Sequence, residues 1–346
     1  MSLAERLHTL TIDIERCTLE PLRSDTPSGW TRHSTLVHLS GGDCDGTGED
    51  VTYGAEEQLA FQAAGAPKLP TGRMSLGDFC AWFKDRDLFG SAPSQAAYRD
   101  YRRWAFESAA LDLALRQAGR SIESVLERTA RPLRFCASMG LGNPPRLDRP
   151  SALRAIHSTL EFKLDAEPHW DDDFVQTLAE FGGVPVIDLK GAYEGTAVDV
   201  PPSPELAARI AQLLPDTIIE DPHRTPEVLA VLEPHSARVS WDAPIHGLAD
   251  LADLPFTPRV MNSKPSRFGS VERLFEFYAH CESEGIALYG GGQFELGVGR
   301  LQIQRLAALF HPDGPNDTAP ISYNDVQITD RLPASPLPAP CAAAGL

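Results

Sequence analysis

The sequence lacks the features that mark secreted, zinc-binding and membrane-spanning proteins. Its six cysteines form no C-x-x-C pair and none has zinc spacing with a histidine, so neither a disulfide framework nor a zinc site is indicated. No apolar run is long enough to cross a bilayer, and no basic-flanked apolar segment predicts a signal peptide. These absences predict a cytoplasmic protein whose cysteines are mostly small core residues in a reducing compartment.

Positive charge is also scarce. The chain has 31 Lys and Arg residues against 48 Asp and Glu residues, which gives a formal net charge of −17. An acidic chain is a poor partner for a phosphate backbone or an anionic membrane surface, so neither nucleic-acid nor membrane binding is predicted. The simplest role of the acidity is solubility. At 346 residues with 42% hydrophobic residues, the chain suits one large barrel and a smaller domain.

What the sequence does contain is a series of short apolar runs that end in charged residues. Four runs between residues 184 and 269 read VPVIDLK, TIIEDPH, ARVSWDAP and RVMNSKPSR, with helical stretches between them. Buried parallel strands have this pattern, and a repeated strand-helix unit predicts a barrel whose strands end at one face. The charged residues that would meet there are Asp188, Glu220, Asp242 and Lys264.

The three carboxylates predict a metal site. Hard oxygen ligands suit Mg²⁺ or a similar divalent cation such as Mn²⁺, with water and substrate at the remaining positions. Without a cation, like charges at close range would raise one another's pKa values. A single strand-end carboxylate is more often a helix cap or a solvated loop residue, so the prediction rests on three of them in successive units.

The pattern divides the chain into two domains. Alternating and turn-rich segments up to about residue 60, followed by helical periodicity, predict a small α+β domain over residues 1–130. The strand-helix units predict a barrel over residues 131–324, with an eighth strand within APISYNDV. Residues 325–346 form a C-terminal tail that either packs or is loose. Because residues 332–346 are rich in Pro and Ala with little to bury, a loose tail is predicted.

Two pairs of charged residues lie near the ends of neighbouring strands. Lys163 and Asp165 are two apart in TLEFKLD, and Asp188 and Lys190 are two apart in the next strand, so each pair shares a face. A further segment, the polar loop over residues 23–33, holds Trp30 and Arg32. This loop is either a lid that contacts substrate or, more simply, a surface loop anchored by one tryptophan.

At this point the sequence resembles a known family. Asp188, Glu220, Asp242, Lys264 and Glu295 follow one another in the order of the enolase superfamily. The KPSRFG and YGGGQFELGVG segments are most similar to its muconate-lactonizing-enzyme-like subgroup, within the mandelate racemase and muconate lactonizing enzyme family. GTGED and AFESAALDLALRQAGRS resemble segments of that family's capping domain, so the resemblance covers most of the chain.

The resemblance implies a fold and a chemistry. The fold is α/β, a (β/α)7β TIM-type barrel with an N-terminal α+β capping domain whose loops cover the site. The subgroup includes cycloisomerases, o-succinylbenzoate synthases and dipeptide epimerases. The implied reaction is Mg²⁺-dependent abstraction of a proton α to a carboxylate, which gives an enediolate. The implied partner is a small-molecule carboxylate substrate, and a homo-oligomer is expected because the family commonly forms them.

The resemblance also implies roles for individual residues. It implies Asp188, Glu220 and Asp242 as metal ligands, Lys264 as an acid/base or cation facing the substrate, and Glu295 beside the substrate at the barrel mouth. A lysine near several cationic groups has a lowered pKa and can act as a base near neutral pH, which we expect here. The candidate catalytic residues are Lys264, Lys163 and Lys190, and the candidate substrate-binding residues are Trp30, Arg32, Asp165, Arg267 and Glu295.

Three positions depart from the subgroup's pattern. The usual K-x-K of the second strand is here Lys163-Leu164-Asp165, the D-x-N of the third ends in Lys190, and the D-E of the fifth is Asp242-Ala243. Two-base racemisation through the usual lysine pair is therefore not predicted, and a lyase or cycloisomerase is favoured. The alternatives are a barrel that binds metal without turnover, as a binding or regulatory protein, and a one-base epimerase of dipeptides or amino acid derivatives.

The departures leave the lysines with more than one interpretation. Lys190 either replaces the missing lysine of the second strand or forms a salt bridge with Asp165. Lys163 is predicted to face inward and to polarise the substrate carboxylate. Arg267 either meets substrate or pairs with a barrel carboxylate.

Overall fold

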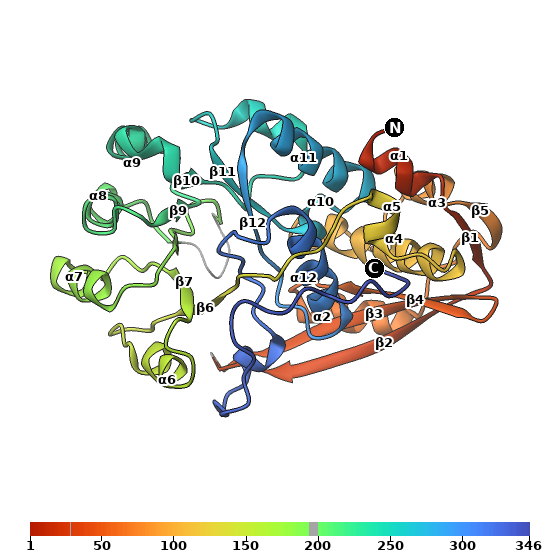
Figure 1. Cartoon of the computed structure of the whole chain (residues 1–346), viewed down its shortest axis with the longest axis horizontal. Coiled ribbons are helices and arrows are strands. Elements are labelled where there is room, and N and C mark those ends of the chain that lie inside the picture. The colour runs from red at the N-terminus through yellow and green to blue at the C-terminus, as the bar shows by residue number, and fades with distance from the viewer. Residues whose placement is uncertain (28, 194–199) are drawn as a thin grey trace.

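The computed structural model describes residues 1–27, 29–193 and 200–346, and it consists of a barrel and a capping domain that lie side by side (Figure 1). The capping domain has an antiparallel sheet in the order β2-β3-β4 and a second antiparallel pair, β1 with β5. Its strands are β1 Thr11–Ile14, β2 Arg16–Asp25, β3 Thr31–Gly41, β4 Cys44–Asp50 and β5 Gly72–Ser75. Its helices are α1 Leu3–His8, α2 Ala55–Ala64, α3 Leu76–Trp82, α4 Tyr98–Gln117 and α5 Ile122–Leu126.

Glycines in β4 allow the long helix α4 to lie directly on the sheet. A Cβ atom at Gly48 would lie 2.0 Å from the carbonyl oxygen of Ala105, and one at Gly46 would lie 2.3 Å from the amide nitrogen of Leu113. Only glycine permits so close an approach of strand and helix backbones. The GTGED segment is therefore needed for packing within the capping domain.

The barrel strands form a nearly complete ring. Five parallel strands pair in the order β10-β9-β8-β7-β6, and β11 pairs in parallel with β12. The amide of Asn262 donates to the Trp241 carbonyl, which joins β11 to the end of β10. The barrel strands are β6 Cys136–Gly140, β7 Glu161–Asp165, β8 Val186–Asp188, β9 Ile218–Glu220, β10 Val239–Ser240, β11 Val260–Ser263 and β12 Ala287–Gly290.

The eighth position of the ring is a short segment at Asn316 and Asp317. The Asp317 amide donates to the Gly290 carbonyl at 2.7 Å, and the Asn316 carbonyl accepts from the Cys136 amide at 2.8 Å, so this segment bridges β12 and β6. The prediction of a strand within APISYNDV was wrong, because residues Ile321–Asn324 form the 3-10 helix η3. The bridge lies a few residues earlier in the chain.

Helices cover the outside of the barrel, with α6 to α9 along one side (Figure 1). Ser203 and Thr225 cap the starts of α8 and α9, since each side chain accepts a hydrogen bond from the first turn and a proline follows. This is the predicted α/β fold, a (β/α)7β TIM-type barrel with an N-terminal α+β capping domain. The helices are α6 Asp148–Ile156, α7 Asp172–Phe181, α8 Pro204–Leu213, α9 Pro226–Leu232, α10 Pro265–Phe268, α11 Val271–Glu284 and α12 Val298–Phe310, with 3-10 helices η1 Glu233–Arg238 and η2 Leu248–Asp253.

The C-terminal segment packs against both domains, so the prediction of a loose tail was wrong. The Leu337 amide donates to the Leu133 carbonyl at 2.8 Å, and the Gly345 amide donates to the Arg120 carbonyl at 3.1 Å. Leu346 is buried. These backbone bonds and the buried terminal leucine hold a segment whose composition alone gave no reason for order. None of the helices in the described part of the chain has the length and hydropathy needed to cross a bilayer.

Candidate active site

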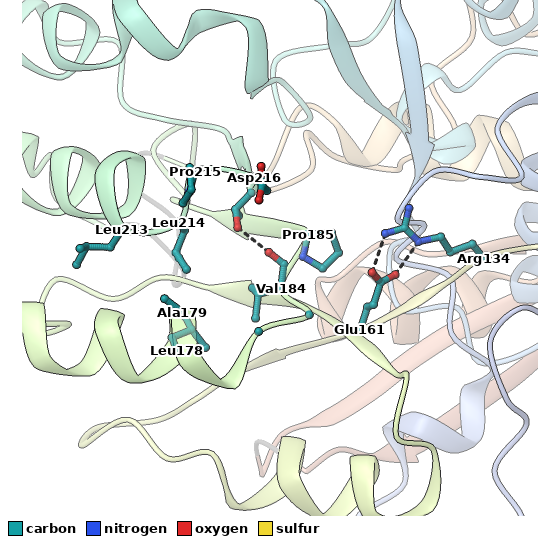
Figure 2. A pocket seen from close by; sticks show the side chains of 13 residues that line it. Arg134, Glu161, Leu178, Ala179, Val184, Pro185, Leu213, Leu214, Pro215 and Asp216 are labelled. Atoms are coloured by element: carbon teal, nitrogen blue, oxygen red, sulfur yellow. Dashed lines mark hydrogen bonds and ion pairs between the residues drawn. The ribbon is translucent and has the colours of Figure 1, made fainter.

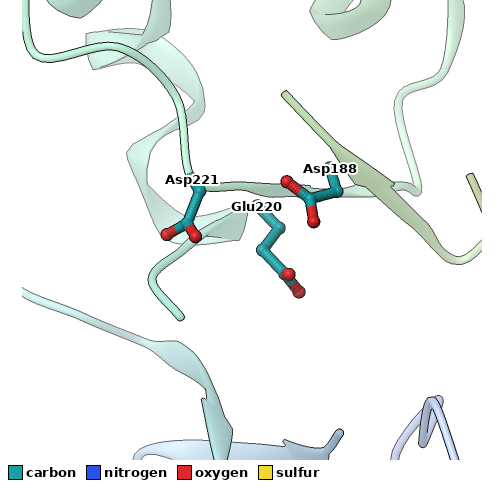
Figure 3. A group of neighbouring side chains, drawn as sticks. All are labelled: Asp188, Glu220 and Asp221. Carbon is teal, nitrogen blue, oxygen red and sulfur yellow. The ribbon is translucent and has the colours of Figure 1, made fainter. Parts of the chain in front are cut away.

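Three carboxylates lie together where β8 and β9 end (Figure 3). Asp188 is the last residue of β8, Glu220 is the last residue of β9, and Asp221 follows directly. One oxygen of each lies within 4.8 Å of the others, and all three residues are fully buried. The β8–β9 register pairs Asp188 with Glu220, so the parallel strands themselves bring the first two together.

Asp221 was not among the predicted site residues. In an extended strand it would face away from Glu220, because side chains alternate between faces. Its φ of 45°, in the left-handed region, turns the chain so that its carboxylate accepts from the amides of Asp242 and Ala243 at 2.8 and 2.9 Å. Burial and the nearby carboxylates of Asp242 and Asp188 raise the pKa of Asp221 to about 7.

Lys163 enters the same region from β7. Its ammonium contacts Glu220 and lies 3.6 Å from Asp188 Oδ2 and 3.9 Å from Asp317 Oδ2. Burial alone would lower the pKa of Lys163, but the carboxylates outweigh burial and raise it well above its usual range. Asp317 was also missed, because its strand consists of a single bridge and shows no apolar run in the sequence.

Both carboxylate oxygens of Glu220 have side-chain partners. One oxygen contacts Lys163, and the other accepts from Asn262 Nδ2 at 3.1 Å and from the hydroxyl of Tyr289. Burial and the neighbouring Asp188 outweigh the attraction of Lys163 and raise the pKa of Glu220 to about 8.

Lys190 lies between two carboxylates on neighbouring strands. Its Nζ is 2.6 Å from Asp188 Oδ2 and 3.0 Å from Asp165 Oδ1, and Asp165 and Asp188 are partners in the β7–β8 register. Burial opposes the charge on Lys190, but the two carboxylates raise its pKa well above the usual range. The contacts favour the ion-pair interpretation of Lys190 over that of a free base.

Asp242 is paired with cationic side chains and is not part of the close carboxylate group. Its Oδ2 is 2.6 Å from Lys264 Nζ and accepts from the Tyr193 hydroxyl at 3.3 Å, while Arg267 Nε lies 3.4 Å from Oδ1. Burial alone would raise the pKa of Asp242, but Arg267 and Lys264 lower it below its usual range. Asp221 thus takes the place in the close carboxylate group that the sequence assigned to Asp242.

The expectation of a lysine with a lowered pKa was wrong for Lys264. Burial and the charges of Lys163 and Arg267 do lower the pKa, but Asp242 at 2.6 Å outweighs them and the pKa is raised. Arg267 is also fixed by Asp242, and it donates to the Ala243 carbonyl at 3.0 Å. Every lysine of the predicted set is therefore paired with a carboxylate.

Arg32 lies at the junction of the two domains and is fully buried. Its guanidinium donates to four backbone carbonyls, those of Val51 and Thr52 in the capping domain and those of Gln293 and Phe294 after β12. Four of the five N–H groups of Arg32 are bonded to backbone carbonyls, so its guanidinium joins the two domains.

Trp30 lies next to this junction, at the tip of the β2–β3 hairpin. Its ring centroid is 6.1 Å from that of Tyr53 and 5.7 Å from that of Phe294, and the residue is 37% exposed. The segment predicted as a long polar loop is mostly strand, since β2 continues to Asp25 and β3 begins at Thr31; residue 28 of it lies outside the described residues. Trp30 therefore belongs to an aromatic group at the edge of the barrel mouth.

Glu295 is buried beside the same junction and pairs with Arg300 at 3.2 Å. The nearby Glu49, which the sequence did not single out, accepts from the amides of Leu296, Gly297 and Gly299 at the start of α12. A carboxylate at a helix N-terminus is stabilised by the unpaired amides and the helix dipole. Burial nevertheless raises the pKa of Glu49, and Glu295 adds to this rise.

A cavity of about 340 Å³ lies at the opposite end of the barrel (Figure 2). It is lined by residues before β6, β8 and β9 and by the first residue of β7, and its polar wall is the ion pair of Arg134 and Glu161 at 2.6 Å. Functional residues of such barrels sit where the strands end, whereas the end where they begin serves stability. The carboxylate group, and not this cavity, is the candidate active site.

The close carboxylates fit a hard divalent cation in donor type and spacing. Asp188, Glu220 and Asp221 offer buried carboxylate oxygens near one another, which is what Mg²⁺ and Mn²⁺ prefer. Burial is the main cause of the raised pKa values of Glu220 and Asp221, and the neighbouring carboxylates add to the rise. The ammonium groups of Lys163 and Lys190 contact the same group of carboxylates.

Comparison with known proteins supports the resemblance. Residues 129–325 match the C-terminal domain of a family described as a domain of unknown function (DUF8230), and residues 5–125 match its N-terminal domain. The chain belongs to the DUF8230 family. The predicted resemblance to the enolase superfamily is confirmed by the following neighbours.

An o-succinylbenzoate synthase from Pasteurella multocida is 26% identical over 52% of this chain and 47% of that protein. The alignments span between 47% and 64% of the curated relatives. An enolase superfamily structure from Listeria innocua has a TM-score of 0.65 and 18% identity, covering 90% of this chain and 86% of that one. A dipeptide epimerase from Methylococcus capsulatus, complexed with Mg ion, has a TM-score of 0.64 and 17% identity, covering 95% and 98%.

Proposed function

We propose that this DUF8230 protein is an enzyme that abstracts a proton α to the carboxylate of a small-molecule acid, and that the resulting enediolate goes on to elimination or cycloisomerisation. One observation carries the proposal. The ring of described strands has eight positions, and Lys163 on β7 lies four positions from Lys264, which follows β11. The strands between them end near Asp188, Glu220 and Asp242. Two ammonium groups therefore face one buried site from opposite walls.

The chemistry requires positive charge where negative charge develops. A proton next to a carboxylate is weakly acidic because its removal places a second negative charge on that carboxylate. Fixed cationic groups in a site shielded from water stabilise this charge strongly. In the proposed reaction, Lys163 faces the substrate carboxylate from β7, and the deprotonated Lys264 accepts the α-proton at its Nζ atom.

We further propose that the site binds a divalent cation, Mg²⁺ or Mn²⁺. Asp188, Glu220 and Asp221 would hold it, whereas Asp242 would remain with Lys264 and Arg267. Such a cation, when bound, neutralises the charge that develops on the substrate carboxylate. Arg267 positions Asp242, and through Asp242 it positions Lys264.

The second candidate function is a binding or regulatory protein without turnover. One observation favours it: Lys163, Lys190 and Lys264 each contact a carboxylate, and the pKa of each is raised, so each is protonated at neutral pH. A base must first lose its proton. The two functions therefore differ in whether α-protons exchange at all.

Exchange of α-protons in D₂O separates the two functions. The protein with Mg²⁺ would be incubated with carboxylic acids, N-acyl amino acids and dipeptides, and mass spectrometry would report deuterium uptake or product. We expect uptake that EDTA abolishes and that falls by about 10²- to 10⁴-fold in Lys264→Met, with Lys84→Met, an exposed lysine of the capping domain, as the control. Because the pKa of Lys264 is raised, the rate should still increase with pH at about pH 9.

The outcomes assign the function. Uptake lost in Lys264→Met supports the enzyme, and deuterated product of inverted configuration would indicate a one-base epimerase. Uptake that survives in Lys264→Met but disappears in Lys190→Met would move the base to Lys190. An absence of exchange across the panel, in protein that binds the cation, would favour the binding function.

A further inference from the structure

The carboxylate site already contains a cation of its own, the ammonium of Lys190. It lies 2.6 Å from Asp188, which is one of the three carboxylates close enough to share one ion. We propose that Lys190 competes with a divalent cation for Asp188, and that Asp165 is the acceptor to which Lys190 moves when the cation binds. This inference rests on the cation site of the proposed function, and it identifies the residues that set the affinity of that site.

Both oxygens of Asp188 are occupied by Lys190. The backbone amide of Lys190 donates to Oδ1 at 3.0 Å, and its Nζ donates to Oδ2 at 2.6 Å. Asp188 is fully buried, so water does not compete for these oxygens. An ammonium and a divalent cation on one carboxylate repel each other, and a bound cation therefore requires that the ammonium move away.

Asp165 offers Lys190 an alternative acceptor. Its Oδ1 is 3.0 Å from Lys190 Nζ as an ion pair, yet this buried oxygen accepts no hydrogen bond. A small rotation of the lysine side chain is sufficient to convert the ion pair into a hydrogen bond. Asp165 also lies nearer to solvent than Asp188, because its side chain is 35% exposed and that of Asp188 is 0% exposed.

The Lys190 side chain is more exposed than that of Lys163, and its backbone is fixed. Its side chain is 18% exposed, whereas that of Lys163 is 2% exposed. Its backbone has a φ of 55°, which a residue with a Cβ atom rarely adopts, and the next amide, that of Gly191, donates to the Asp221 carbonyl at 2.8 Å. The motion is therefore confined to the ammonium end of the lysine.

The residue exchange seen in the sequence is consistent with this role. The lysine expected at position 165 is an aspartate, and the asparagine expected at position 190 is a lysine. The β7–β8 register places Asp165 beside Asp188, so the new lysine and the new aspartate meet at the edge of the carboxylate group. Lys190 provides the ammonium in the site, and Asp165 provides the acceptor to which it can move, so both changes are needed.

The two residues should change cation affinity in opposite directions. Lys190→Met removes the competing ammonium while keeping chain length, so it should tighten Mn²⁺ binding by about ten-fold or more. Among the described residues, Asp165→Asn leaves Lys190 with one ion-pair partner, Asp188, so it should weaken binding several-fold. Asp165→Asn should weaken Mn²⁺ binding more in the parent protein than in the Lys190→Met variant. In the parent, Lys190 needs Asp165 as its second acceptor, whereas in Lys190→Met there is no ammonium to move.

The test is a titration of the intact protein with Mn²⁺ alone, in which electron paramagnetic resonance reports the free ion. Lys84→Met and Asp85→Asn, at exposed positions of the capping domain, make the same changes in net charge far from the barrel and should leave the affinity unchanged. Circular dichroism would verify folding, and Lys190→Gln provides a second neutral variant if Lys190→Met does not fold.

Tighter binding in both neutral variants and weaker binding in Asp165→Asn would support the proposal. An affinity of Lys190→Met within about two-fold of the parent would overturn it, as would a failure of both proteins to bind Mn²⁺. The proposed function fails separately. If Lys190→Met binds Mn²⁺ more tightly but no acid exchanges its α-proton, the competition stands and the enzyme proposal does not.

Discussion

Two of the places where this molecule buries charge balance it differently. At the junction of the domains, Arg32 donates to four backbone carbonyls and Glu49 accepts from three backbone amides. At the barrel mouth, Asp188, Glu220 and Asp242 contact the ammonium groups of lysine side chains. At the junction, each of these charged side chains is therefore paired with backbone dipoles. At the barrel mouth, carboxylates are paired with ammonium groups.

The difference distinguishes a structural contact from a reactive one. A backbone carbonyl or amide in a folded segment cannot leave its partner unless that segment unfolds. A lysine side chain can rotate away, and a substrate carboxylate or a metal ion can take its place. The junction therefore fixes the geometry of the two domains, whereas the barrel mouth holds charges that can be exchanged.

Residues with a strained backbone also gather at the barrel mouth. Among the described residues, four non-glycine residues have positive φ, and three of them, Lys190, Asp221 and Phe294, follow the ends of barrel strands. Such conformations persist where the surrounding structure holds them, and they are typical of functional sites.

The largest expected effect is the loss of Arg32. Arg32→Met would leave four buried carbonyls without their donor, so the free energy of unfolding should fall by about 3–5 kcal/mol. Urea unfolding followed by circular dichroism would measure it. A loss below about 1 kcal/mol would contradict the structural role of Arg32 and reopen its assignment to substrate.

The next largest effect is a dependence of stability on pH, which comes from the buried imidazole of His311. Burial lowers the pKa of His311 from 6.5 to about 4, although its hydrogen bond with Asn316 raises it. Between these values the unfolded chain binds a proton that the folded chain does not, so this contribution is full above pH 6.5 and is lost as the pH falls towards 4. It amounts to roughly 3 kcal/mol.

The matching measurement is urea unfolding between these two pH values, with the parent protein compared with His311→Gln. The slope of stability against pH in this range should be reduced in the variant. An unchanged slope would show that His311 does not titrate as its burial implies. Because His311 bonds to Asn316, the result also reports on the segment that closes the barrel.

The second charge of the junction should be less costly to change. Glu49→Gln keeps the shape but replaces a carboxylate that accepts from three amides and from Ser34 with a neutral amide, so we expect a loss of about 1–3 kcal/mol. Thermal unfolding would measure it, with Glu15→Gln, at an exposed position, as the control. Equal melting temperatures for the two variants would contradict the helix-capping role of Glu49.

The smallest expected effect is on stability at the barrel mouth. Asp165→Asn removes a partly exposed carboxylate, and such ion pairs contribute little, so the free energy of unfolding should change by less than about 1 kcal/mol. The same variant should change Mn²⁺ affinity several-fold. A large loss of stability would place Asp165 with the fixed charges of the junction.

Much of the site could be predicted from strand patterns. Asp188, Glu220, Asp242 and Lys264 end or follow apolar runs, and parallel strands bring such ends to one face. Lys163 was predicted to face inward, on the same face as Asp165 two residues later, and it is buried. For these positions, the apolar runs and the alternation of side chains along a strand were sufficient.

The remaining features depend on contacts between distant segments. Asp221 joins the carboxylates because one left-handed residue turns it there, and Asp317 belongs to a strand too short to show an apolar run. Arg32 was assigned to substrate because its four acceptors lie about 20 and 260 residues away in the chain. The pKa of Lys264 was misjudged because the sequence does not show that Asp242 lies 2.6 Å from its ammonium.

A crystal structure of the protein soaked with Mn²⁺ would test the central contrast most directly. The account predicts an anomalous difference peak beside Asp188 and Glu220, with Lys190 moved to Asp165 and with Arg32 and Glu49 unchanged. A peak at that position with Lys190 still on Asp188, or no peak at all, would contradict the view that the charges at the barrel mouth are exchangeable.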